Sequence, residues 1–305
     1  MIYCYHHNDM DGIFAGAVID KAFPATEKKF ISSSYPINTE NIISTLSAVV
    51  GITKVFFVDL SFGFNKKRSD VPFIERLASI CKEKSIEVVW IDHHEKSKMF
   101  INSGYEMPEN IKYRVDTNEC GAIGTYHYIY GENVKYPSFL SLVDIWDRHL
   151  TYAKGWENAV YFQYKVMLDM KIPSDSCYTE LLIGGAPYLT YLCQQGKIIY
   201  DYFSDHSKRL IASDAVITTV NGIECLALNV HDSSMIFDSV RDKFPLLMQW
   251  HYDGSLYHYS IYRGNENIDC NAIAMEYGGG GHVGAAGFSS SVLLFRENMI
   301  KYKPK

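Results

Sequence analysis

The feature that most constrains the fold is an alternation, over the first 92 residues, of strand-like runs and segments with helical spacing. The strand-like runs are 2–5, 28–34, 54–62 and 86–92, and the helical segments between them are 11–23, 38–50 and 71–84. Nearly continuous apolar strands joined by helices are typical of parallel sheets with both faces buried. The sequence therefore predicts an α/β fold that begins with a parallel sheet covered on both sides by helices.

The pattern changes in the second half of the chain. A long helical segment at 188–212 leads into a remainder that is rich in short β-like runs. We therefore expect a domain at 1–190, a linker helix at 191–212 and, at 213–305, a smaller C-terminal α/β domain with a mixed sheet.

Composition argues against several classes of protein. The seven cysteines are odd in number and form no CxxC pair, which predicts a reduced, cytoplasmic protein and not a disulfide or zinc scaffold. A formal net charge of −6 makes a wide basic groove for long nucleic acid unexpected. No apolar run approaches the roughly 20 residues that span a bilayer, so we expect no membrane association.

Acidic and histidine residues follow the first predicted strand, in the segment "HHNDMDG". His7, Asp9 and Asp11 are spaced by two, so in an extended segment their side chains would point the same way. Carboxylates packed together repel one another unless a cation holds them. Carboxylate oxygens and an imidazole suit Mn²⁺ or Mg²⁺, and also allow Zn²⁺ or Fe²⁺.

Two further strand-like runs end in the same kind of residue. Asp59 closes one, and Asp92, His93 and His94 close the other. Ligand sites of parallel sheets lie past the carboxyl ends of the strands, so these side chains should meet those of the first strand. Adjacent residues of an extended segment face opposite sides, which predicts that one histidine binds metal and the other faces substrate. Singly, Asp59 could be a helix N-cap and the histidines ordinary loop residues.

A helical segment at 139–150 could add one more carboxylate. Asp144 is the preferred candidate, and Asp147, one turn later, is the alternative. Six ligands exceed what one ion with open positions needs, so two ions sharing a bridging carboxylate fit better, as in two-metal hydrolysis of phosphate esters.

The segment "YGGGGHVGAAGF" is the second chemical feature. The backbone amides of Gly279, Gly280 and Gly281 could cradle phosphate oxygens, and His282 could add a donor. Arg263 could pair with a phosphate. A tight turn and an ordinary surface arginine are the alternatives.

Five segments, in this order, resemble the motifs of the DHH/DHHA1 phosphoesterase family: "HNDMDG", "FFVDLSF", "WIDHHE", "LVDIWDRH" and "YGGGGHVGAAGF". The resemblance spans nearly the whole chain. It implies an N-terminal DHH domain, a C-terminal DHHA1 domain and a dinuclear centre that holds Mn²⁺, with Mg²⁺ or Co²⁺ as alternatives.

The resemblance also implies a role for each candidate residue. For the metal centre it implies His7 and Asp9 on one ion, Asp11, His93 and Asp144 on the other, and Asp59 as the bridge. For the substrate it implies His94 on the scissile phosphate, oriented by Asp92, and Gly279, Gly280, Gly281, His282 and Arg263 on the terminal phosphate or nucleotide.

The activity that the resemblance favours is hydrolysis of short single-stranded oligonucleotides or dinucleotides to mononucleotides by a metal-activated water. Such an enzyme would be an exonuclease similar to nano-RNases and oligoribonucleases, as a monomer or a homodimer. The alternatives are a cyclic-dinucleotide phosphodiesterase or nucleotide phosphatase and, in another class, a catalytically inactive nucleotide-binding regulator.

Overall fold

The computed structural model describes residues 1–63, 70–281 and 283–304 of the chain. The chain divides into two compact units, Met1–Ile199 and Tyr200–Lys305. Among the described helices, none combines the length and the apolar character that a membrane span requires.

The first unit is built on a five-stranded sheet in which every pairing is parallel. Its strands are β1 (Ile2–His7), β2 (Lys28–Ser33), β3 (Lys54–Val58), β4 (Glu87–Asp92) and β5 (Ile111–Val115), in the order β2-β1-β3-β4-β5. The chain therefore reverses direction across the sheet beside β1, and the carboxyl ends of β1, β3 and β4 lie next to one another. The predicted parallel sheet is confirmed.

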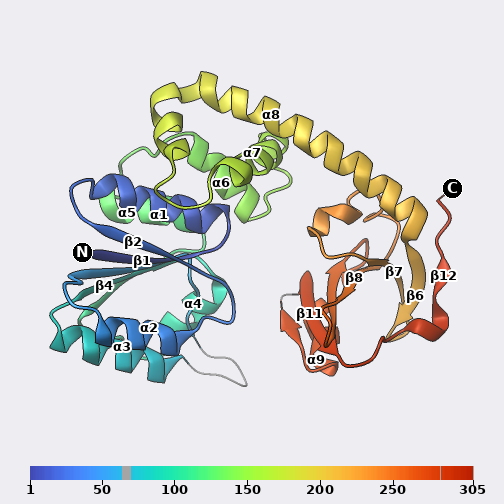
Figure 1. Cartoon of the computed structure of the whole chain (residues 1–305), viewed down its shortest axis with the longest axis horizontal. Coiled ribbons are helices and arrows are strands. Elements are labelled where there is room, and N and C mark those ends of the chain that lie inside the picture. The colour runs from blue at the N-terminus through green and yellow to red at the C-terminus, as the bar shows by residue number, and fades with distance from the viewer. Residues whose placement is uncertain (64–69, 282, 305) are drawn as a thin grey trace. The chain divides into compact units, whose positions relative to one another are not determined.

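Helices cover both faces of this sheet (Figure 1). One face carries α1 (Met10–Ala22) and α5 (Gly121–Tyr130), and the other carries α2 (Thr39–Ala48), α3 (Val71–Glu83) and α4 (Glu95–Ile101). Alternate strand residues supply the two cores: Cys4 and Phe56 pack on the α1 face, whereas Tyr5 and Phe57 pack on the α2 face. Burial on both faces explains why the three central strands, β1, β3 and β4, are nearly continuous apolar runs.

Three more helices complete the core on the α1 face: α6 (Phe139–Asp147), α7 (Trp156–Asp169) and α8 (Ser176–Asp214). The last of these begins earlier than the sequence predicted and is broken at Gly185, whose backbone (φ 53°, ψ −144°) is not helical. The boundary between the two units falls within α8.

The second unit contains a seven-stranded sheet in the order β10-β11-β9-β8-β7-β6-β12. Its strands are β6 (Val216–Val220), β7 (Ile223–Asn229), β8 (Leu246–Tyr252), β9 (Tyr257–Arg263), β10 (Gly280–Gly281), β11 (Ala285–Ser290) and β12 (Ile300–Lys301). Only β7 and β8 pair in parallel, so the sheet is mixed, as expected. The helix α9 (Cys270–Glu276) packs on one face.

Candidate metal centre

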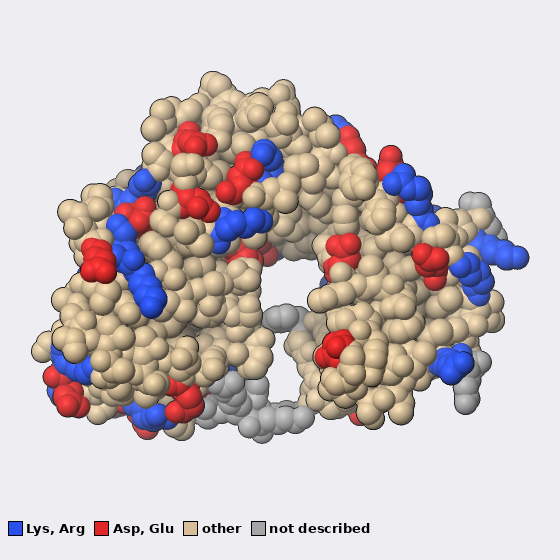
Figure 2. Space-filling model, viewed as in Figure 1, with Lys and Arg blue, Asp and Glu red and all other residues tan. Residues whose placement is uncertain are grey.

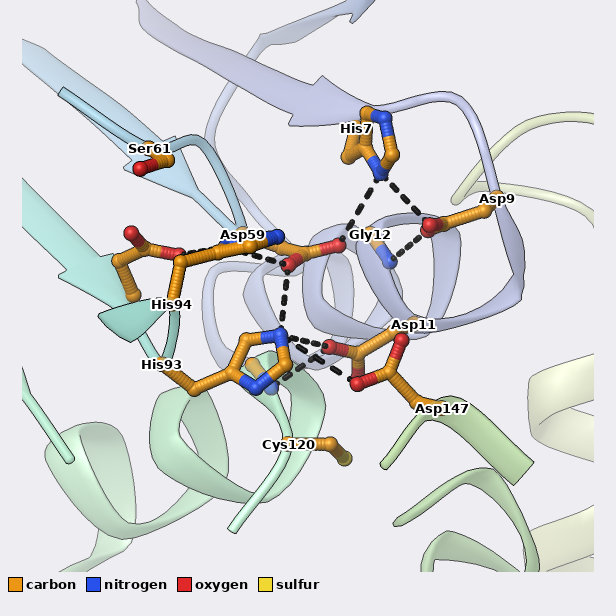
Figure 3. A network of polar contacts seen from close by, with 12 residues as sticks. His7, Asp9, Asp11, Gly12, Asp59, Ser61, His93, His94, Cys120 and Asp147 are labelled. Carbon is orange, nitrogen blue, oxygen red and sulfur yellow. Dashed lines mark hydrogen bonds and ion pairs between the residues drawn. The ribbon is translucent and has the colours of Figure 1, made fainter. Parts of the chain in front are cut away.

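The carboxyl ends of β1, β3 and β4 carry the candidate site (Figure 3). His7 is the last residue of β1, Asp59 follows β3, and Asp92 is the last residue of β4. The strand order places these three ends side by side, which brings together side chains far apart in sequence.

The segment after β1 does not have the predicted extended geometry. The helix α1 starts at Met10, and Asp9 is its N-cap, with its Oδ1 accepting a hydrogen bond from the Gly12 amide (3.0 Å). Aspartate is favoured at an N-cap because its carboxylate satisfies an amide at the helix start. Asp11 therefore lies in the first helical turn, and its position comes from the helix and not from a strand alternation.

Asp59 is the central residue of the cluster. Its side chain is buried, and neither carboxylate oxygen has a hydrogen-bond partner among the residues that the structure describes. Oδ2 lies 3.7 Å from His7 Nδ1, whereas Oδ1 lies 3.2 Å from His93 Nε2 and 3.8 Å from His94 Nδ1. One carboxylate thus faces two groups of ligand atoms, the geometry that a bridge between two ions requires.

The first of these groups consists of His7, Asp9 and Asp59, and His7 Nδ1 lies 2.6 Å from Asp9 Oδ2. The second consists of Asp11, His93 and Asp147. In it, His93 Nε2 lies 3.3 Å from Asp147 Oδ2 and 3.7 Å from Asp11 Oδ2. In each group, all the ligand atoms lie within 4.8 Å of one another.

The structure corrects the preference for Asp144. The carboxylate of Asp144 forms a two-pronged ion pair with Arg148 (2.8 and 2.7 Å) and accepts a hydrogen bond from the Cys120 amide (2.8 Å). Asp147, the alternative, points into the cluster, where its Oδ2 is buried and has no hydrogen-bond partner. The two carboxylates leave α6 in different directions, so only Asp147 faces His93.

The two adjacent histidines also depart from the prediction. They do not face opposite sides: their rings lie 4.6 Å apart, and both approach Asp59. Their partners nevertheless differ, because His94 Nδ1 lies 2.7 Å from Asp92 Oδ1 whereas His93 faces Asp11 and Asp147. His94 is the N-cap of α4, so the chain has already turned out of the strand there.

The pattern of missing hydrogen bonds fits bound cations. The buried atoms without a partner include both oxygens of Asp59, Oδ2 of Asp147 and Nε2 of His93. Some nine in ten buried polar groups in proteins have a partner, so four such atoms gathered in one place require an explanation. Carboxylate oxygens and imidazole nitrogens are ligands for Mn²⁺, Mg²⁺ or Zn²⁺, and the residues present therefore fit a divalent metal centre.

In the second unit, the glycine-rich segment packs against its neighbours. The Gly279 amide donates to the Ala274 carbonyl and the Gly281 amide to Asn271 Oδ1, both over 2.9 Å. A Cβ on Gly279 would lie 2.1 Å from the Gly287 carbonyl oxygen, so the close approach of β10 to β11 requires this glycine. Contrary to the prediction, these two amides are already used within the protein.

Arg263 lies beside this segment. It ends β9, its amide donates to the Gly284 carbonyl (2.9 Å), and its exposed guanidinium donates to Asn267 Oδ1 (3.1 Å). Gly280 and Gly281 of the segment are exposed as well, whereas His282 lies outside the described residues. The second unit therefore brings Arg263 and the glycine segment together.

Comparison with known proteins identifies solved structures with a similar fold. No family model matches the sequence, and no curated protein matches it. Two solved structures of exonuclease RecJ do match the fold. One, bound to manganese, is 14% identical, with 97% of this chain and 87% of that chain covered and a TM-score of 0.53. The other, from Thermus thermophilus with Mn²⁺, is 13% identical, with 97% of this chain and 50% of that chain covered and a TM-score of 0.53.

The chain therefore shares the fold of these RecJ structures, and this is the fold that the resemblance to the DHH/DHHA1 family implies. We refer to the first unit, with its all-parallel sheet, as the DHH domain and to the second, with its mixed sheet, as the DHHA1 domain, after the motifs that they carry. The chain spans only half the length of the Thermus protein.

Sequence reasoning missed one residue that builds the DHH site, Gly121. The amides of Gly121 and Ala122, at the start of α5, donate to the two oxygens of Asp11 (2.6 and 2.8 Å). A Cβ on Gly121 would lie 2.8 Å from Asp59 Cβ and 2.9 Å from Asp11 Oδ2. A glycine at the start of a helix that follows a sheet strand was the available indication.

Crowding of charge shifts the pKa of several groups in the DHH domain. Burial, followed by neighbouring carboxylates, raises the pKa of Asp59 and of Asp147 well above the usual aspartate range. Burial also raises the pKa of Asp11. Burial lowers the pKa of His7, but the neighbouring carboxylates of Asp59 and Asp9 outweigh this and raise it to about 10. Metal binding at these side chains would therefore compete with their protonation.

Proposed function

We propose that this chain is a metal-dependent phosphoesterase that hydrolyses short oligonucleotides or dinucleotides to mononucleotides. The observation that carries the proposal is the buried Asp59 carboxylate, which has no hydrogen-bond partner in the described part of the chain and faces a group of ligand atoms on either side. A buried carboxylate so placed is unfavourable unless cations neutralise it.

The residues that would hold two divalent cations follow from the two groups. We assign His7 and Asp9 to one ion, Asp11, His93 and Asp147 to the other, and Asp59 to both. Mn²⁺ suits this mixture of oxygen and nitrogen ligands. Two bound ions would supply activation of water and neutralisation of charge on the phosphoryl oxygens.

His94 is the side chain that we propose contacts the scissile phosphate. Asp92, buried at the end of β4, holds His94 Nδ1 and so fixes the ring. Burial lowers the pKa of His94, but the hydrogen bond to Asp92 outweighs burial, so the pKa is raised. An imidazole fixed in this way can donate a hydrogen bond from its other ring nitrogen to a phosphoryl oxygen or to the leaving group when that nitrogen carries a proton.

In the DHHA1 domain, we propose that Arg263 binds the terminal phosphate or nucleotide of the substrate. Its guanidinium is exposed and is placed by Asn267 beside the glycine segment. Guanidinium groups bind phosphate through paired hydrogen bonds. Gly280 and His282 remain candidate partners of the same phosphate.

A short substrate agrees with the distribution of charge. Lysine, arginine, aspartate and glutamate side chains are interspersed on the visible face of each unit (Figure 2). Long nucleic acids are bound chiefly through extended positive surfaces, whereas a dinucleotide needs only a local site.

The test is a panel of linear nucleotides from two to ten residues, together with cyclic dinucleotides, incubated with Mn²⁺. We expect mononucleotides from the shortest linear substrates, and no products in excess chelator or with Asp59→Asn. Faster cleavage of the cyclic compounds would favour the cyclic-dinucleotide alternative. Nucleotide binding by the Mn²⁺-loaded protein without turnover would instead identify a regulator.

A further inference from the structure

Tyr35 is an exposed aromatic residue in the DHH domain that the proposed chemistry does not use. It lies between β2 and α2, and 46% of its surface is exposed. Its hydroxyl is nevertheless fixed, because it accepts a hydrogen bond from the Ser61 amide (2.6 Å) just after β3. The ring is thus held in place and remains open to solvent.

The Tyr35 ring lies against two imidazoles of the metal cluster. Its centroid is 5.2 Å from that of His7, at a tilt of 47°, and 6.3 Å from that of His94, which it meets edge-on at 80°. These histidines come from the ends of different strands, β1 and β4. A phosphate that contacts both the ions and His94 would therefore carry its flanking nucleoside close to this ring.

A purely structural role does not account for the ring. The Ser61 amide needs only an acceptor, which many smaller polar side chains could supply. An aromatic ring, by contrast, offers a flat apolar surface on which any of the nucleobases can stack. The exposed part of this ring, held beside the polar cluster, is therefore available to a bound base.

We propose that Tyr35 is a specificity-determining residue whose ring stacks on the base next to the scissile phosphate. The inference rests on the proposed function and deepens it, since it makes the substrate a nucleotide with a base and not any phosphodiester. Stacking tolerates every base, so the expected preference is for a base over no base, with little preference among bases.

The experiment compares a dinucleotide with its analogue that lacks the base next to the cleaved bond. For the wild-type protein with Mn²⁺, we expect kcat/KM to favour the base-bearing substrate by on the order of tenfold. Tyr35→Leu removes the ring and should abolish this preference by raising KM for the base-bearing substrate alone. Tyr35→Phe keeps the ring but loses the hydroxyl, and should keep the preference. Tyr113→Leu, on β5, is the matched control, because Tyr113 is 44% exposed.

If Tyr35→Leu and Tyr35→Phe slow both substrates equally, Tyr35 only anchors the Ser61 segment and the inference is wrong. A second measurement does not depend on turnover. It follows, in the presence of Mn²⁺, the fluorescence of a dinucleotide that contains 2-aminopurine and has a methylphosphonate link in place of the phosphodiester. Wild-type protein and Tyr35→Phe should quench it, and Tyr35→Leu should not. Quenching without hydrolysis of any substrate would refute the proposed function but keep the stacking site, whereas equal quenching by all variants would refute the stacking site.

Discussion

At the scale of single residues, the site depends on which carboxylates of α6 and α1 reach the cluster. The choice between Asp144 and Asp147 could not be made from sequence, because residues three apart on a helix differ by about 60° in direction and roughly 4.5 Å along the axis. Which one faces the sheet depends on the rotation of α6, which packing sets. In the structure Arg148 binds Asp144 and leaves Asp147 to the cluster.

We therefore predict that Asp147→Asn and Asp144→Asn have different effects on hydrolysis. Loss of a residue that only orients a metal ligand already reduces activity 10- to 100-fold in other enzymes, so Asp147→Asn should reduce kcat/KM by more than about 100-fold. Asp144→Asn should reduce it by about tenfold or less, because it weakens only the support from Arg148 and Cys120. The opposite ranking, in Mn²⁺ assays of both variants, would restore Asp144 as the ligand.

At the scale of elements, the first four strands of the DHH domain and the helices between them could be predicted, because β1, β3 and β4 are nearly continuous apolar runs. The fifth strand, β5, was not predicted, because its polar, partly exposed sequence IKYRV lacks that pattern. The candidate ligands at the ends of β1, β3 and β4 could also be predicted, because the carboxyl ends of parallel strands lie at the same edge of the sheet. Local geometry could not: the spacing of His7, Asp9 and Asp11 suggests an extended segment, whereas the N-cap preference of Asp9 starts a helix there. Gly121 was missed because its role depends on contacts with residues more than 60 positions away.

Asp9 combines two roles in α1, and two substitutions separate them. Asparagine caps helices about as well as aspartate, whereas alanine costs about 1 kcal/mol at this position. In chelator, Asp9→Ala should therefore unfold at a lower temperature than Asp9→Asn, as measured by circular dichroism. Both variants should lose Mn²⁺-dependent hydrolysis, because neither supplies a carboxylate beside His7. Equal unfolding temperatures would show that the cap contributes little to stability.

The break in α8 can be tested by the direction in which a substitution of Gly185 changes stability. Gly185 has a backbone conformation that is essentially restricted to glycine, and a Cβ there would meet nothing within 4 Å. Gly185→Ala should therefore destabilise the protein by roughly 1–3 kcal/mol through the backbone alone. If α8 were instead continuous at this point, alanine would stabilise it by up to about 1 kcal/mol. Thermal unfolding of the single variant distinguishes the two.

At the scale of the whole molecule, the cluster links stability to pH and to metal. Asp11, Asp59 and Asp147 have a raised pKa in the folded, metal-free protein, so as pH rises above the unfolded value of 3.8 these groups reduce stability. His7, with a folded pKa of about 10 against 6.5, contributes stability that is complete below 6.5 and is lost as pH rises through 10. Both effects therefore lower the stability of the folded, metal-free protein as pH rises.

Mn²⁺ should reverse this trend, because it binds ionised carboxylates and neutral imidazoles. We predict that the Mn²⁺-induced increase in Tm grows between about pH 5.5 and pH 8. At a Mn²⁺ concentration about 100 times the dissociation constant, binding stabilises the folded protein by about 2.7 kcal/mol, which corresponds to a rise in Tm of several degrees. Differential scanning fluorimetry of wild-type protein and Asp59→Asn measures it. A shift that is independent of pH, or that persists in the variant, would contradict metal binding at this cluster.

Asp59 has a further property, a left-handed backbone (φ 56°), that bears on which amino acids its position can hold. Among residues with a side chain, asparagine and aspartate tolerate that conformation best. Glutamate would keep the negative charge but strain the chain, and asparagine would relax the chain but forfeit the charge. Aspartate is therefore the amino acid that both supplies a negative charge and tolerates this backbone conformation.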